Sequence, residues 1–308
     1  YVSRNRKMLE EMGFFSEDQI NEMISADQVE TQNNKKAIEL AKKSDVVILA
    51  MGENALEAGE AGAKTNLKLP ANQLDLINKI SKLNKKIVLL IISGRPLVLT
   101  NIVDKVDAIL ECWFPGTEGG NAIADLIFGK NNPSGRLTMT FPYAVGQEPI
   151  YYNHLSTGRP AHNSQHVGRF VSKYLDAPAD PLYPFGFGLS YGETDYRDLK
   201  LDKKVISKDD KLHVSIKVEN TSEWDRKETI QLYFNDQVAS IVQPVKRLID
   251  FKKVLVPQHS SKIVEFTVSP NQLQFFDNHG ALILEPGKFT LFVGKNSSDC
   301  LSEEFSLK

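Results

Sequence analysis

The sequence predicts an α/β sandwich with a mostly parallel sheet, followed by an all-β sandwich of the immunoglobulin type. In the first half, continuous apolar runs such as residues 46–51 alternate with patterns of helical period. In the second half, short strands with strict alternation, such as residues 212–218, follow one another between turn signals. The change falls at the aromatic stretch 183–191, and 308 residues suffice for two domains.

The first half has the order of a layered α/β domain. Residues 1–34 are polar and helix-like, and Ser16 and Gln19 have the spacing of a capping box. Continuous apolar runs indicate strands covered on both faces, so helices on both sides of the sheet are expected. The predicted strands are 46–51, 87–92, 108–114 and an edge strand at 137–142, and the predicted helices are 36–41, 70–80 and 121–128.

Four segments are predicted along the chain. A loop-rich connection precedes the second domain because its prolines are many and its periodicity is weak. The segments are a helical N-terminal segment (1–34), an α/β sandwich domain (35–150), a loop-rich connection (151–190) and an all-β sandwich (191–308).

Composition excludes several classes of partner. The formal net charge is −2, so no basic field would attract nucleic acid or an anionic membrane. No apolar run approaches the roughly 20 residues of a membrane helix. Cys112 and Cys300 fall in different predicted domains, so the sequence indicates neither a disulfide framework nor a cellular compartment.

The loop 52–66 is the most suggestive candidate site. Ligands of parallel sheets bind beyond the carboxyl ends of the strands, where this loop lies together with 93–96 and 115–120. It carries Glu53, Glu57 and Glu60 among small residues. A carboxyl group on such a loop can act as a general acid when closure desolvates it, although acidic loops are more often solvated surface.

Two other motifs are weaker. Residues 188–192 match the G-x-S-x-G pattern of serine hydrolases, but no strand–turn–helix context surrounds them, so a tight junction between domains is favoured. Residues 116–120 open a predicted helix, where backbone N–H groups can hold an anion, yet no phosphate-loop pattern follows.

The histidines give no metal site. His162 and His166 stand four residues apart, but their loop is polar and offers no further ligand, so solvated side chains are favoured. His154, among aromatic neighbours, fits either a sugar site or packing. We therefore predict no metal and no cofactor.

Several segments together resemble glycoside hydrolase family 3, of the β-glucosidase type. The resemblance covers about residues 35–308, and its second part resembles the fibronectin type III-like domain of that family. The segments are 44–53, 93–97, 113–122, 132–137, 141–142, 151–160, 183–191, 231–236 and 244–248.

The resemblance implies a retaining mechanism with two carboxylates. In the family, an aspartate nucleophile lies on a (β/α)8 barrel, and the acid/base is commonly a glutamate on a loop of the following α/β sandwich. The position that matches the acid/base is Glu60, with Glu57 as the fallback for a different loop register. The resemblance also suggests Lys64, His154 and Arg159 as sugar contacts.

Two departures limit this expectation. Related loops carry Ser and Arg where this sequence has Ala63 and Lys64, and lysine lacks the planar fork of arginine. The barrel and the usual first strand of the sandwich are not found in these residues. We therefore expect little hydrolysis without a barrel supplied in cis or in trans.

A β-linked oligosaccharide or glycoside is the expected ligand, and an uncovered docking face would favour self-association into a homo-oligomer. A non-catalytic carbohydrate-binding or scaffold module is the alternative. A serine hydrolase or nucleotide-binding enzyme is a distant third.

Overall fold

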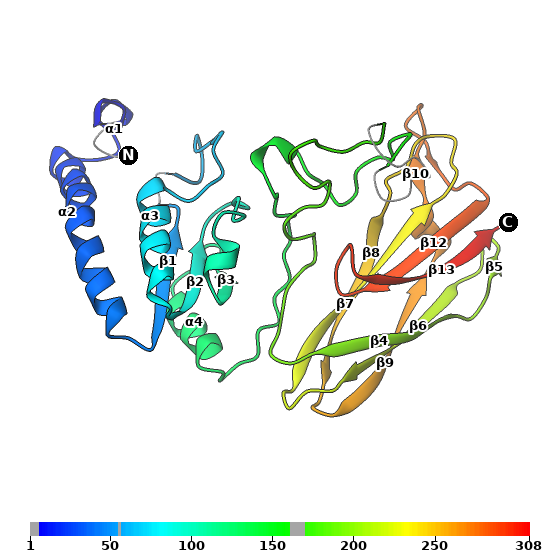
Figure 1. Ribbon diagram of the computed structural model, residues 1–308. Helices are drawn as coiled ribbons and strands as arrows, with labels where there is room; N and C mark the ends of the chain where they lie inside the picture. Colours follow the sequence, from blue (N-terminus) through cyan, green and yellow to red (C-terminus); the bar gives the residue numbers. More distant parts are fainter. Residues whose placement is uncertain (1–5, 55–56, 161–169) are drawn as a thin grey trace. The chain divides into compact units, whose positions relative to one another are not determined.

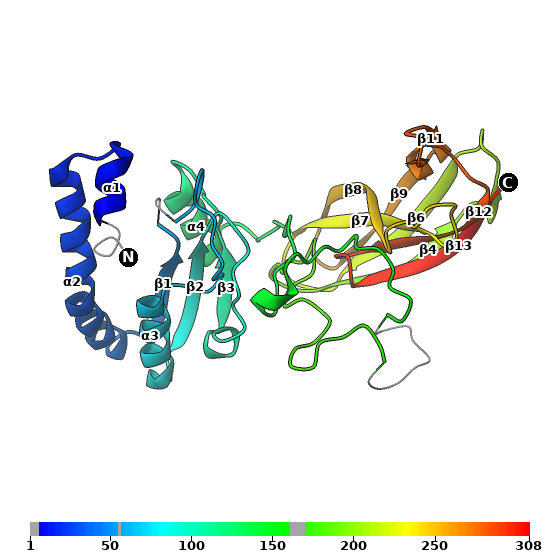
Figure 2. The same cartoon turned by 90° about the horizontal axis from the view of Figure 1, so that it is seen from above.

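The computed structural model forms two compact units, residues 1–116 and 117–308, which are described separately. It describes residues 6–54, 57–160 and 170–308, without the side chains of residues 25–32. Figures 1 and 2 show a helical and parallel-stranded first unit and a second unit built mainly of β-strands. The predicted fold class, an α/β sandwich followed by a β-sandwich, is confirmed.

Two helices begin the chain. Helix α1 (Arg6–Met12) buries Leu9, which packs with Ile20 of helix α2 (Glu17–Lys42). The predicted capping box is present, since the Ser16 hydroxyl accepts from the Gln19 N–H and the Gln19 side chain accepts from the Ser16 N–H. Helix α2 runs without a break past residue 34, where the sequence suggested a segment boundary.

The first unit contains a three-stranded parallel sheet in the order β1-β2-β3. The strands are β1 (Val46–Gly52), β2 (Lys86–Ile92) and β3 (Ala108–Glu111). Helix α3 (Ala71–Ile80) begins after Pro70 and buries Leu76, Ile77 and Ile80. Its Gln73 side chain bonds to both backbone groups of Gly52, 2.9 Å from the N–H and 3.0 Å from the carbonyl oxygen, and so joins the helix to the end of β1. Short 3-10 helices follow at Ser81–Leu83 and Val103–Lys105.

One predicted strand is absent. Residues 137–142 form a single bridge, between Phe141 and Tyr183, rather than a strand of the parallel sheet. The Phe141 N–H donates to the Tyr183 carbonyl at 2.8 Å, and the Leu137 N–H donates to the Phe187 carbonyl at 2.8 Å. These backbone N–H groups of the extended segment are therefore hydrogen-bonded to the loop at residues 183–187. The extended segment belongs to the second unit, as do helix α4 (Gly119–Ile127) and a short 3-10 helix at Val145–Gln147.

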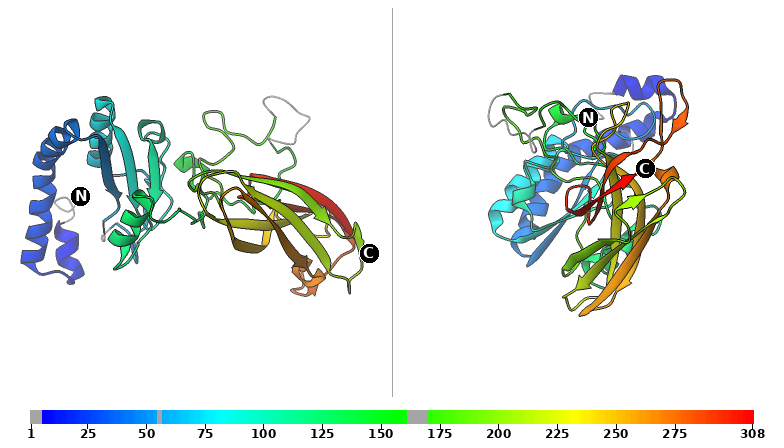
Figure 3. Two further views of the ribbon diagram at one scale, coloured as in Figure 1. Left: turned by 90° about the horizontal axis from the view of Figure 1, so that it is seen from below. Right: turned by 90° about the vertical axis from the view of Figure 1, so that its right-hand side faces the viewer.

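The second unit is a β-sandwich whose two main sheets are ordered β5-β13-β12-β7-β8 and β4-β6-β9 (Figure 3). Alternation along β6 buries every second residue, as the sequence predicted, and these side chains join one apolar core between the sheets. The strands are β4 (Thr194–Leu201), β5 (Val205–Ile206), β6 (Leu212–Asn220), β7 (Arg226–Asp236), β8 (Arg247–Val256), β9 (Ser260–Val268), β10 (Phe275–Phe276), β11 (Leu282–Ile283), β12 (Gly287–Gly294) and β13 (Cys300–Leu307).

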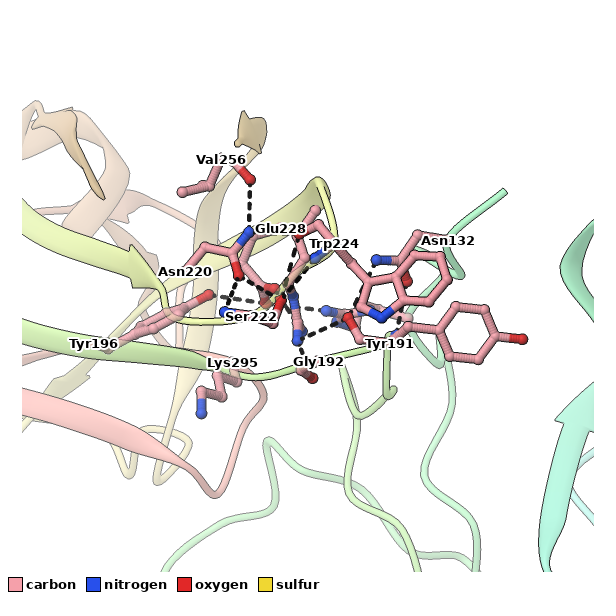
Figure 4. Close-up of polar contacts among 12 residues, drawn as sticks. Asn132, Tyr191, Gly192, Tyr196, Asn220, Ser222, Trp224, Glu228, Val256 and Lys295 are labelled. Carbon is pink, nitrogen blue, oxygen red and sulfur yellow. Dashed lines mark hydrogen bonds and ion pairs between the residues drawn. The ribbon is translucent and has the colours of Figure 1, made fainter. Parts of the chain in front are cut away.

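A buried amide fixes one end of the sandwich. The Asn220 side chain donates to the carbonyls of Trp224 and Val256 and accepts from Ser222 (Figure 4). Its amide nitrogen also lies 3.1 Å from the Pro257 carbonyl oxygen. The bond to Val256 is buried, where an unpaired acceptor would be costly.

A buried carboxylate holds the loops to the same end. Glu228 accepts from Arg136 at 3.0 Å, from Arg226 at 3.1 Å and from the Tyr196 hydroxyl at 3.2 Å. Arg226 also donates to the Gly192 carbonyl. Burial, and then the Glu228 charge, raise the pKa of Tyr196 far above its ordinary value, so its hydroxyl remains a donor.

The G-x-S-x-G match, residues 188–192, lies directly before strand β4. Ser190 precedes strand β4, whereas the nucleophile elbow of a serine hydrolase needs a helix after the serine. Gly192, at φ +80°, turns the chain beside Ser222. Residues 188–192 lie within the second unit and lack the helix that a hydrolase elbow has after its serine.

Across the described residues, the helices are too short or too polar to cross a bilayer.

Removing the Glu228 carboxylate should leave two buried guanidinium groups unpaired. We expect Glu228→Ala to lower the free energy of unfolding of the second unit by about 3–5 kcal/mol, the usual cost of breaking a buried ion pair. The urea dependence of hydrogen exchange in peptides from β6 and β7 measures this. Glu223→Ala, at a side chain that is 81% exposed, is the control and should change it by less than about 0.5 kcal/mol. Equal effects of the two substitutions would contradict the assignment.

Candidate active-site loop

Three loops meet at the carboxyl edge of the parallel sheet. Strands β1, β2 and β3 run in register and end at Gly52, Ile92 and Glu111. The predicted loop after β1 and the loop containing Arg95 therefore start side by side. Residues 55 and 56 lie outside the described part of the first loop.

Gly52 allows the two strands to approach closely at this edge. Its φ is +148°, and a Cβ there would lie 1.8 Å from the Ile92 carbonyl oxygen. Only glycine fits such a contact. The same carbonyl accepts from the Glu53 N–H at 2.9 Å, which fixes Glu53 at the start of the loop.

Glu53 is the centre of a buried charge network. Its residue is 7% exposed, and its carboxylate pairs with Arg95 Nε at 3.1 Å and with Lys64 Nζ at 3.2 Å. Lys64 also pairs with Glu57 at 3.0 Å. Two carboxylates and two cations therefore balance, which is the condition under which buried charges are tolerated.

The two candidate acids occupy different environments. Glu57 is engaged, since its Oε1 pairs with Lys64 and its Oε2 accepts from the Asn54 N–H at 3.3 Å. Glu60 is exposed, and within the described residues its carboxylate has neither a hydrogen bond nor an ion pair. Glu60 is thus the carboxyl group of this loop that is available to a ligand.

Lys64 was predicted to contact sugar. The structure places its ammonium between Glu53 and Glu57, and its side chain is 22% exposed. In this arrangement the cation stabilises the loop internally.

Glu111, at the end of β3, is a further titratable group at this edge. Its Oε1 accepts from the Trp113 N–H at 3.0 Å. Burial raises the pKa of Glu111 to about 7, although the Trp113 N–H and the Ser93 hydroxyl favour the charged form. Glu111 therefore changes charge near neutral pH.

The other predicted sugar contacts lie in the second unit. His154 and Arg159 are both exposed. The His154 carbonyl accepts from the Val245 N–H at 2.9 Å, and the Arg159 carbonyl accepts from the Ser172 N–H at 2.8 Å, so the backbone of each is held. Their proposed contacts with sugar remain predictions.

No three metal-ligating side chains come together in the part of the chain that the structure describes. The predicted solvated pair, His162 and His166, lies outside the described residues.

Sequence reasoning missed the roles of Arg95, Glu53 and Glu111. The sequence did contain a signal: Glu53 and Arg95 follow apolar strands and Glu111 ends one, at the edge where ligands of parallel sheets bind. What the sequence did not show is that Arg95 pairs with Glu53, which lies 42 positions earlier in the chain.

Two parts of the chain match known protein families. Residues 6–191 match the glycosyl hydrolase family 3 C-terminal domain, and residues 228–297 match a fibronectin type III-like domain. The chain belongs to glycosyl hydrolase family 3. The resemblance that the sequence motifs suggested is therefore confirmed.

Relatives in this family are named as enzymes for two kinds of sugar. A periplasmic beta-glucosidase of Salmonella typhimurium is 42% identical over 272 residues, covering 88% of this chain and 35% of the relative. A beta-xylosidase of Formosa agariphila is 36% identical over 262 residues, covering 85% of this chain and 35% of the relative. The chain thus spans about a third of the length of these family 3 relatives.

A solved structure gives the same relationship in three dimensions. The beta-glucosidase from Listeria innocua in complex with isofagomine superposes with a TM-score of 0.86 at 39% identity. The match covers 90% of this chain and 38% of that one.

Ionisation of Glu111 should make the first unit less stable as the pH rises. The folded state keeps the proton up to a pKa of about 7, whereas the unfolded chain releases it near 4.5, so stability falls between these two values. The full loss is at most about 3 kcal/mol. Glu111→Gln should flatten this pH dependence, measured by the urea dependence of hydrogen exchange in β1 and β2.

Glu60→Gln is the matched control, because it makes the same substitution at an exposed position of the same unit. It should leave the slope unchanged. A slope that survives in Glu111→Gln would show that another group causes it.

Proposed function

We propose that this chain supplies the acid/base residue, Glu60, to a retaining β-glucosidase-type glycoside hydrolase that acts on terminal β-linked sugars. The observation that carries the proposal is the contrast within one loop. Glu53 and Glu57 are held by Lys64, whereas Glu60 is exposed and without a bond in the described part of the chain. A general acid has to reach a substrate oxygen, and Glu60 is placed to do so.

The proposed reaction has two steps. In the first, the Glu60 carboxyl group donates its proton to the glycosidic oxygen while a second carboxylate attacks the anomeric carbon. In the second, the Glu60 carboxylate takes a proton from the water that releases the sugar. The attacking carboxylate would come from a (β/α)8 barrel, in cis or in trans. Closure by barrel and substrate would favour the protonated acid by excluding water.

The names of the relatives suggest a class of substrate and not one particular sugar. The names of the relatives include a beta-glucosidase and a beta-xylosidase. We propose small β-glucosides or β-xylosides as substrates, with the choice of sugar made by the barrel.

Hydrolysis should require a second domain. We expect these 308 residues alone to leave p-nitrophenyl β-glucoside unchanged, because the attacking carboxylate is not among the groups that this loop provides. A chimaera in which the chain replaces the matching 38% of the Listeria innocua beta-glucosidase should hydrolyse it. Release of p-nitrophenol measures both. Turnover by the chain alone that Glu60→Gln abolishes would contradict this account.

The role of Glu60 can be separated from that of Glu57 in the chimaera. Glu60→Ala should lower kcat for p-nitrophenyl β-glucoside by about 10²–10⁴-fold, because hydrolysis of the glycosyl-enzyme loses its general base. Added azide should restore turnover and yield a β-glycosyl azide, because this anion attacks the glycosyl-enzyme without a general base. Glu57→Ala is the control, and azide should not rescue it.

Azide rescue of Glu57→Ala in place of Glu60→Ala would move the role to Glu57. Glucose binding by the 308-residue chain alone, measured by calorimetry, together with a folded chimaera that does not hydrolyse, would favour a carbohydrate-binding or scaffold module.

A further inference from the structure

Arg95 connects both sides of the loop to the end of strand β1. Its Nη2 donates to the carbonyl of Glu57 at 2.6 Å and to the carbonyl of Gly62 at 2.7 Å. These two carbonyls stand three residues before and two residues after Glu60. The same guanidinium donates from Nε to Glu53 at 3.1 Å. One side chain therefore sets the distance across the turn and ties that turn to the sheet.

The backbone between the Glu57 and Gly62 carbonyls is a tight turn. Gly59 has φ +107° and Ala61 has φ +59°, and the Gly62 N–H donates to the Gly59 carbonyl at 3.0 Å. Glu60 stands between these two left-handed residues. Because its own carboxylate has no bond within the described residues, the position of that group depends on the backbone that carries it.

Arg95 is itself held in place. The buried Ser93 hydroxyl donates to the Arg95 carbonyl at 2.9 Å, and Pro96 follows directly. A planar guanidinium with fixed donor directions can bond two carbonyls and a carboxylate at once, whereas the ammonium of lysine is a point charge without this fork.

We propose that Arg95 is the positioning residue that holds Glu60 where it can protonate a leaving group. The proposal rests on the function proposed above for Glu60. Lys64 differs from Arg95 because, among the described residues, its ammonium pairs with the carboxylates of Glu53 and Glu57 and with no carbonyl of the loop backbone. A displacement of about 1 Å of a catalytic group can lower the rate about 10²-fold. Loss of the hydrogen bonds from Arg95 to the loop backbone should therefore lower the rate of catalysis.

The first test uses the 308-residue chain and needs no activity. Arg95→Lys keeps a cation facing Glu53 but removes the two hydrogen bonds from Arg95 to the carbonyls of Glu57 and Gly62. We expect hydrogen exchange at the hydrogen-bonded amides of Glu57 and Gly62, followed by NMR, to accelerate at least about tenfold, while amides in β1 and β2 keep their rates. Lys64→Met is the matched control and should change the Gly62 rate by less than about threefold.

Unchanged exchange at Gly62 in Arg95→Lys would overturn the proposal, and so would equal acceleration in Lys64→Met. Should Arg95→Lys also loosen β1 and β2, Arg95→Ala with added guanidinium ion decides. If the guanidinium ion restores protection of the Gly62 amide and potassium chloride at the same concentration does not, the positioning role of Arg95 is supported. If protection is not restored, that role is overturned.

The second test compares leaving groups in the chimaera. Expulsion of 2,4-dinitrophenolate needs little help from a general acid, whereas methoxyphenolate needs a proton. Arg95→Lys should lower kcat/KM for 4-methoxyphenyl β-glucoside by at least about tenfold, and for 2,4-dinitrophenyl β-glucoside by less than about threefold. A merely structural role would lower both equally, and that result overturns the proposal.

Glu60→Ala, measured alongside, separates the two proposals. If Glu60→Ala shows no leaving-group dependence, the assignment of the acid fails, whatever Arg95 does. If Glu60→Ala shows a leaving-group dependence and Arg95→Lys does not, only the positioning role of Arg95 fails.

Discussion

The ion pair between the buried carboxylate of Glu53 and the partly exposed guanidinium of Arg95 is the interaction on which the candidate site depends. It joins residues that follow two neighbouring parallel strands, and it is formed because Gly52 lets those strands meet without a side chain between them. A buried carboxylate needs full compensation. Lys64 supplies the second cation, and the remaining donors of Arg95 are used on loop carbonyls. Through these contacts, the turn of the loop is tied to the ends of two strands.

Much of the fold could be predicted because its elements are locally encoded. Continuous apolar runs gave β1 and β2, the capping residues gave the start of α2, and alternation gave β6. Two features were not anticipated. Helix α2 is longer than predicted, which fits the lack of Gly and Pro over its 26 residues. Residues 137–142 are extended but pair with a loop more than 40 positions later, and local pattern carries no information about such partners.

The position of the candidate loop could be predicted, but its internal contacts could not. The rule for parallel sheets placed the loop at the carboxyl edge of the strands, where the structure has it, and the family resemblance proposed Glu60 as the acid/base. Sequence alone could not rank the three loop carboxylates, since Glu53, Glu57 and Glu60 have similar neighbours. Their difference arises from Arg95 and Lys64, which determine which carboxylates are paired. The assignment of Glu60 therefore joins a family expectation to a local electrostatic argument.

We propose that this chain shapes the Glu60 loop by itself, without a barrel. Hydrogen exchange of peptides spanning residues 57–66, followed by mass spectrometry, tests this by comparing the 308-residue chain with the chimaera. We expect protection in the isolated chain that is close to that in the chimaera. Fast, unprotected exchange in the isolated chain, with protection acquired only in the chimaera, would contradict it.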